Sequence, residues 1–168
     1  VIDYGLVLQI IFLERVARSR RLIRLAFRRI IPAFLIRNWK VTDRSSSMLV
    51  MRHDAFRHIE IELFVRRDQL ADALEFARET IEVAGGGEST LSADNQRRIE
   101  GLGMQEELAG LHDQYCHHFP ICVRRVLPDD TLISMASGVG EDWCALSFIS
   151  YARPARRDGF SLFAGFMA

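Results

Sequence analysis

The sequence lacks most of the cysteine patterns that point to a cross-linked or metal-bound fold. Only three cysteines occur among its 168 residues, with no CxxC pair and no metal-ligand spacing. A disulfide framework and a zinc site are therefore not indicated. An odd number of cysteines without a recognisable signal peptide suggests a reducing compartment and free, buried thiols. We expect a cytoplasmic protein, with a peripheral position at the membrane as the alternative.

Lysine is almost absent, because Lys40 is the only one and arginine supplies every other positive side chain. The formal net charge is zero, which gives no overall electrostatic case for a nucleic-acid partner. The charge is unevenly spread: residues 1–44 carry about seven more basic than acidic groups, and residues 54–113 about eight more acidic than basic ones. We expect no nucleic-acid partner.

Long apolar runs are also missing. Residues 6–13 are apolar but are soon interrupted by charge, and a membrane span needs roughly 20 apolar residues. Residues 22–31 place apolar side chains at helical spacing with arginines opposite them, and Pro32 ends or kinks that helix. Residues 1–38 are thus predicted as a basic amphipathic helical segment. Its apolar face either packs on a domain or lies on an anionic membrane surface.

The remaining residues alternate between strand and helix patterns. Strands are predicted over residues 48–52, over 58–65, around Arg124, over 131–135 and over 143–152. Helices are predicted from about Asp68 to the glycines at 85–87, more weakly from Ser92 toward Tyr115 with breaks at glycines, and from about Asp158 onward. Short turns join the later strands, so these strands should pair antiparallel. The fold class is α+β, with a mainly antiparallel sheet covered by helices on one face.

Arg124 is the residue whose surroundings bear most on function. Alternation places it on the same strand face as Cys122 and Val126, and a guanidinium on a half-buried strand needs an acidic or oxygen-rich partner. Glu60 and Glu62 share one face of the strand at 58–65. These carboxylates either raise each other's pKa, line a solvated face, or supply a partner for Arg124. Whether the partner is internal or a ligand stays open at this point.

Other candidate sites are weaker. His58, His117 and His118 have no HxxxH or HExxH spacing, and neighbouring histidines on a strand point to opposite faces, so we expect no metal site. A cation beside Cys122 favours its thiolate, but no histidine is placed beside it, so a cysteine nucleophile is not expected. Asp129 and the aspartate after it follow a proline and predict a turn. No residue is assigned a catalytic role.

Three blocks of the sequence carry a family resemblance. Residues 57–62, 117–134 and 146–151 resemble the C-terminal cap domain of FAD-linked sugar-lactone oxidases, the D-arabinono-1,4-lactone and L-gulono-1,4-lactone oxidase group with its alditol oxidase relatives. The similarity extends from about residue 39 to residue 168. The positions that match the Pro-(Ile/Val)-Glu-Val-Arg strand, the Asp-Asp turn and the Leu-Ser ending are Pro120, Val123, Arg124, Asp129, Asp130, Leu132 and Ser134.

The resemblance implies a substrate cap over residues 39–168, incomplete at its C-terminus. The cap closes over FAD, which is held mainly by an N-terminal flavin-binding domain not present in this chain, and a hydride passes from a sugar lactone or polyol-like alcohol to the flavin. Arg124 is the implied substrate-binding residue, and Glu60 and Glu62 are further candidates. The fragment alone is expected to be inactive.

The chain departs from this family at two points. Cys122 stands where the family has a glutamate that, together with the arginine, contacts substrate hydroxyls. The family's His-Trp-Gly-Lys segment is expected beyond residue 168. The alternative is a non-catalytic α+β interaction module, in which Arg124 pairs with Glu60 or Glu62 and the basic helix docks a partner or a membrane surface.

Overall fold

The computed structural model describes residues 22, 25, 28, 29, 42, 44–46, 57–87, 90–138, 140, 142–152 and 154–168. The chain divides into two compact units, Val1–Arg57 and His58–Ala168. In the first unit the described Leu22 and Leu25 are exposed. Arg28 and Arg29 are described and exposed as well. The other residues of the predicted basic helix at 1–38, and the whole predicted strand at 48–52, lie outside the described residues. The division into a segment at 1–38 and a cap at 39–168 stays a prediction.

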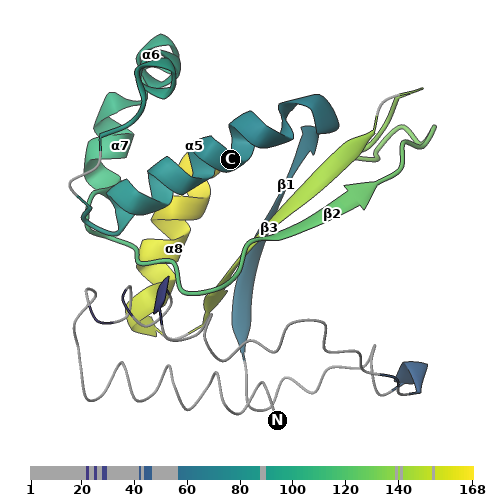
Figure 1. The fold of residues 1–168 in the computed structure, drawn as a ribbon, viewed down its shortest axis with the longest axis horizontal. Helices are drawn as coiled ribbons and strands as arrows, with labels where there is room; N and C mark the ends of the chain where they lie inside the picture. Colours follow the sequence, from purple (N-terminus) through teal and green to yellow (C-terminus); the bar gives the residue numbers. More distant parts are fainter. Residues whose placement is uncertain are drawn as a thin grey trace. The chain divides into compact units, whose positions relative to one another are not determined.

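The second unit is built on a three-stranded antiparallel sheet. Its strands are β1 (His58–Arg66), β2 (Cys122–Val126) and β3 (Trp143–Tyr151), in the spatial order β1-β3-β2 (Figure 1). The last strand in the sequence is therefore the central one. Its Ser147 lies opposite Glu62 on one side and Cys122 on the other. The predicted α+β class and antiparallel pairing are confirmed.

Four α-helices accompany the sheet. They are α5 (Leu70–Ala84), entered through the short 3₁₀ turn η3 (Arg67–Gln69), then α6 (Ala93–Leu102), α7 (Gln105–Leu111) and α8 (Pro154–Met167). Helices α5 and α8 lie on one side of the sheet, and α6 and α7 lie beyond them (Figure 1). The sheet thus has one face toward these helices. The opposite face carries none of the helices described for this unit, and we call it the open face (Figure 1).

The core lies between the sheet and these helices. Alternation along β1 directs Ile59, Ile61, Leu63 and Val65 toward it, as the sequence predicts. The buried Phe148 of β3 meets Phe163 of α8 with ring centroids 5.6 Å apart in an edge-on arrangement, which aromatic pairs favour. The other buried core members are Ala77, Ala84, Ile99, Leu111, Tyr115, Leu146, Phe160 and Phe166.

The predicted helix boundaries are confirmed in part. Asp68 does not cap α5, because a 3₁₀ turn precedes that helix and its N-cap is Gln69 without a side-chain bond. Ser92 does cap α6 by accepting a hydrogen bond from the Asn95 N–H. Gly103 then ends α6 at φ 70°, a backbone angle that glycine adopts without strain, so the segment forms two helices.

Two further predictions need correction. Helix α8 begins at Pro154 rather than near Asp158, since proline suits the first turn of a helix. The predicted strand at 131–135 is a loop of turns, whose hydrogen bonds are described below. The cysteines are free, but only Cys116 and Cys144 are buried, while Cys122 is exposed.

A buried carboxylate fastens α6 to α5. Glu79 of α5 accepts hydrogen bonds from the Ser92 N–H at 3.0 Å, the Ser92 hydroxyl at 3.2 Å and the Asn95 amide at 2.7 Å. Burial alone raises the pKa of Glu79, but the bonds from Asn95 and Ser92 outweigh it and hold that pKa below its usual value. The charge is therefore stabilised by donors at the start of α6.

Two adjacent histidines, His117 and His118, lie in the segment that connects α7 to β2. The Tyr115 hydroxyl lies 2.8 Å from Nδ1 of His117, and burial lowers the pKa of His117 to about 4. The Tyr151 N–H donates to Nε2 of His118 at 3.2 Å, so Nδ1 carries the proton and faces the Cys116 carbonyl at 3.1 Å. Both rings are parts of the packed interior.

His117 makes stability depend on pH. Its pKa of about 4 in the fold lies below the ordinary value near 6.5, so its contribution is fully present above pH 6.5 and is lost as the pH falls toward 4. Between pH 7 and pH 5 we expect a loss of about 2 kcal/mol in unfolding free energy. Denaturant titrations should show H117N with a flatter dependence over that range. An unchanged slope in H117N would contradict this assignment.

Gly159 marks a close approach of α8 to another segment. A Cβ at this position would lie 2.2 Å from the Gln114 carbonyl oxygen, whereas a Cβ at Gly165 in the same helix meets nothing within 4 Å. We expect G159A to lower the unfolding free energy by about 2 kcal/mol or more. The matched variant G165A should raise it by roughly 0.5–1 kcal/mol, because alanine favours the helix. Equal effects of the two variants in chemical denaturation would refute this packing account.

Candidate functional site

The open face carries the candidate residues on three different strands. Glu60 and Glu62 project from β1 because they alternate with the core-facing isoleucines and leucine. Ser147 stands between the outer strands on β3, and the register places Arg124 of β2 opposite Ala145, two residues before Ser147. We call Glu60, Glu62, Arg124 and Ser147 the Arg124 cluster.

Hydrogen bonds join this cluster across the sheet. Nη2 of Arg124 donates to Oε1 of Glu62, and it also donates to the Ser147 hydroxyl at 3.0 Å. The Ser147 hydroxyl in turn donates to the same Glu62 oxygen at 3.0 Å. Oε1 of Glu60 lies 3.9 Å from Nη2 of Arg124. The structure thus brings together all three residues that the sequence singled out.

Ser147 is the member of the cluster that sequence reasoning missed. It is 1% exposed and lies in a largely apolar strand, which also holds the buried Ser150. A hydroxyl buried in such a strand favours a hydrogen-bond partner, which points to Ser147 and equally to Ser150, although the buried Ser150 hydroxyl has no hydrogen-bond partner among the described residues. The identity of the partner of Ser147 depends on β3 being the central strand, which the sequence does not reveal.

The exposure of Arg124 corrects the premise of a half-buried strand. All residues of β2 except Val126 are exposed, and the Arg124 side chain is 61% exposed. Its charge is therefore hydrated as well as paired, and an exposed ion pair contributes little to stability. Of the three guanidinium nitrogens of Arg124, only Nη2 makes hydrogen bonds to other described residues. The other guanidinium N–H groups remain as donors for an oxygen atom from outside this unit.

The cluster offers both a donor and an acceptor at one place. A guanidinium donates but never accepts, and an ionised carboxylate accepts but does not donate. An alcohol hydroxyl needs both kinds of partner, so the adjacent Arg124 and Glu62 side chains suit a hydroxyl group. Because the carboxylates offset the arginine charge, the cluster is less suited to a strongly anionic ligand.

A second ionic cluster lies at the base of the loop between β2 and β3. Asp142 accepts from Nη2 of Arg125 at 2.9 Å and from Nη1 of Arg67 at 2.9 Å, and its carbonyl accepts the Arg67 N–H at 2.9 Å. The bonds from Arg125 and Arg67 hold the pKa of Asp142 below its usual range. Asp142 therefore links the ends of all three strands.

The part of the chain that the structure describes does not fit FAD by itself. Pyrophosphate binding commonly uses a glycine-rich turn between a strand and a helix N-terminus. Here β1 is joined to α5 through Arg67–Gln69, with no glycine. Among the described residues, no group of three or more His, Cys, Asp or Glu side chains could hold a metal ion. No helix in those residues combines the length and the apolarity needed to cross a membrane.

Comparisons with known proteins give one informative match. No family model matches the chain, and no solved structure matches it. A protein named long-chain alcohol oxidase, from an uncultured marine euryarchaeote, is 89% identical over 166 residues. The match covers 99% of this chain and 35% of that protein, so the chain spans about a third of the length of this relative.

The Arg124 cluster should be nearly neutral for folding. R124A and E62Q should each change the unfolding free energy by less than about 1 kcal/mol, because exposed ion pairs are hydrated and screened. Denaturant titration of each variant, with R97A at an exposed pair on α6 as the control, measures this. A loss of several kcal/mol in R124A alone would mean that the arginine is a structural ion-pair partner.

Proposed function

We propose that this chain is the substrate-binding part of an FAD-dependent oxidase that acts on an alcohol group. The observation that carries the proposal is the Arg124 cluster. It places hydrogen-bond donors and acceptors for a substrate hydroxyl on the open face of the sheet. The name of the 89% identical relative supports an alcohol as the substrate and oxidation as the reaction. FAD, bound mainly by a part of the polypeptide outside this chain, would supply the hydride acceptor.

Each residue of the cluster has a role in this proposal. Glu62 accepts a hydrogen bond from the substrate hydroxyl. The guanidinium N–H groups of Arg124 that make no other hydrogen bond donate to the oxygen of the same hydroxyl. Such donors favour negative charge that develops on oxygen as the alcohol is oxidised. Ser147 is a positioning residue, since its hydroxyl bonds to both Arg124 and Glu62. Glu60, at 3.9 Å from Arg124, adds a further acceptor.

For the substrate we favour a long-chain alcohol over a sugar lactone or polyol. The family resemblance supports a lactone, but the name of a relative with 89% identity is the more specific observation. Cys122 stands where the lactone and alditol oxidases have a second hydroxyl-binding side chain. A site with fewer hydroxyl partners suits a substrate with fewer hydroxyls. The lactone remains the second substrate to compare.

The decisive experiment uses the complete polypeptide that contains this chain. The purified protein should show flavin absorption bands and should oxidise a long-chain primary alcohol with a higher kcat/KM than a sugar lactone. We expect R124A to lower kcat/KM for the alcohol by about 100-fold, the effect of losing one preorganised donor at a reacting oxygen. Flavin content and thermal stability should be unchanged. R97A on α6 is the control and should retain activity.

Two results would contradict the proposal. A complete protein without flavin and without alcohol turnover would favour the alternative, a non-catalytic interaction module. The ion pair between Arg124 and Glu62 is the observation that favours that alternative. Full activity in R124A would leave the oxidase reaction standing but would remove Arg124 from the substrate site.

A further inference from the structure

The connection from β2 to β3 presents large apolar side chains to solvent. We call residues 127–138 the docking loop. Leu132 is 99% exposed, Ile133 98%, Met135 66% and Leu127 64%. Four such side chains in one short loop concentrate exposed apolar surface at one place, and large exposed apolar surfaces mark contact with a partner.

The docking loop is held in a defined shape by its own hydrogen bonds. The Asp129 carboxylate accepts from the Thr131 N–H at 2.9 Å, the Thr131 hydroxyl at 2.6 Å and the Ser134 hydroxyl at 2.5 Å. These bonds hold the pKa of Asp129 below its usual range. The Asp129 N–H also donates to the carbonyl of the buried Ala136 at 3.2 Å. The apolar side chains are therefore displayed by an ordered backbone.

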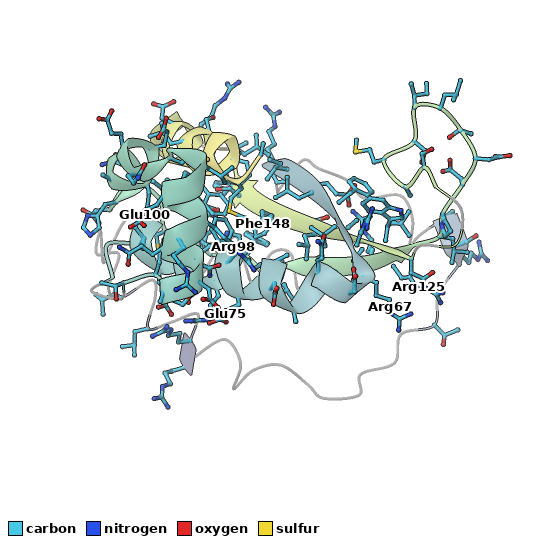
Figure 2. The ribbon with its side chains drawn as sticks, turned by 90° about the horizontal axis from the view of Figure 1, so that it is seen from above. Arg67, Glu75, Arg98, Glu100, Arg125 and Phe148 are labelled. Carbon is cyan, nitrogen blue, oxygen red and sulfur yellow. The ribbon has the colours of Figure 1, made fainter. Side chains whose placement is uncertain are left out.

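The connection that contains the docking loop is also bonded to the sheet that carries the candidate site, through Asp142 just before β3. Asp142 accepts hydrogen bonds from Arg125 on β2 and from Arg67 directly after β1. Arg124 lies only three residues before Leu127. Figure 1 shows the connection at the end of the sheet remote from α6 and α7, and Figure 2 shows the same separation from above. A partner that fixes the loop would thereby also fix the Arg124 cluster.

The kind of partner follows from charge and chain length. Asp129 and Asp130 adjoin the apolar residues, and their negative charges disfavour an anionic membrane surface. The 89% identical relative has roughly two-thirds of its length outside the matched region, since the match covers 35% of it. An apolar surface contributed by that additional polypeptide is the partner that these observations favour.

We propose that the docking loop packs into an apolar hollow on the flavin-binding part of the complete protein and so sets the position of the Arg124 cluster. This inference rests on the proposed function, because it takes polypeptide outside this chain to hold the flavin. Leu132 and Ile133 are the anchors, and the bonds of Asp129 keep them oriented. Docking removes their side chains from water, which favours association.

Maleimide labelling of the complete protein tests the docking directly. The variants I133C and L102C are each labelled in the native and in the denatured protein. Both carry C122S as well, which removes the exposed native thiol of this chain. Mass spectrometry then quantifies each site. Leu102 on α6 is 70% exposed and is the matched control. We expect I133C to react at least ten-fold more slowly in the native than in the denatured protein, and L102C to react at similar rates in both.

A second variant keeps the test independent of cysteine chemistry. In the complete protein, L132S/I133S should lower kcat/KM for the alcohol at least ten-fold, whereas L102S should have no effect. Equal native reactivity of I133C and L102C would overturn the docking. So would protection that requires phosphatidylcholine vesicles, which would indicate a membrane, or protection that is lost on dilution, which would indicate a second copy.

The two proposals can fail separately. If the protein contains flavin and oxidises the alcohol while I133C reacts freely, the docking is wrong and the proposed function stands. If I133C is protected at every protein concentration but the protein holds no flavin, the loop docks on the additional polypeptide and the oxidase function is wrong.

Discussion

The pairing of β3 with both of its neighbours is the interaction on which the rest of this structure depends. As the central strand, β3 hydrogen-bonds to β1 and β2 and fixes their register, with Ser147 opposite Glu62 and Cys122. Leu146 and Phe148 point into the core, while Ser147 between them faces the opposite side. One strand thereby anchors the helices on one face and assembles the Arg124 cluster on the other. Glu62 and Arg124, which are 62 residues apart, meet only because of it.

Local patterns in the sequence predict a large part of this fold. The alternation at 58–65, the apolar spacing after Asp68 and the phenylalanines of α8 each specify an element whose apolar face is buried. The failures come from interactions that a local pattern does not contain. Residues 131–135 resemble a strand, but the Asp129 carboxylate binds Thr131 and Ser134 and stabilises turns instead.

The candidate site was predictable in part. The residue types and faces of Glu60, Glu62 and Arg124 followed from alternation, and the structure places them together. The role of Ser147 and the exposure of Arg124 were not predictable, because both depend on strand order. Ser147 hydrogen-bonds to side chains of both outer strands because β3 is the central strand. Arg124 remains hydrated because β2 lies at the edge of the sheet. Tertiary arrangement decides both properties.

Strand β2 and the loop that follows it both have a place in the proposed enzyme. The strand itself presents Arg124 to the substrate, and its continuation forms the ordered loop that displays Leu132 and Ile133. Asp142 joins the base of this loop to the sheet through Arg67 and Arg125. Substrate binding and attachment to the rest of the protein would thus be mechanically linked, since a displaced loop shifts the strand that carries the arginine.

The central claim is that the substrate alcohol lies on the open face of the sheet. Photolabelling of the complete protein with a diazirine-bearing long-chain alcohol, followed by peptide mapping, tests it most directly. The account predicts label in the peptides that contain residues 58–66 and 122–126, with protection by excess unlabelled alcohol. Protected label confined to α5, α6 and α7, on the other side of the sheet, would contradict it.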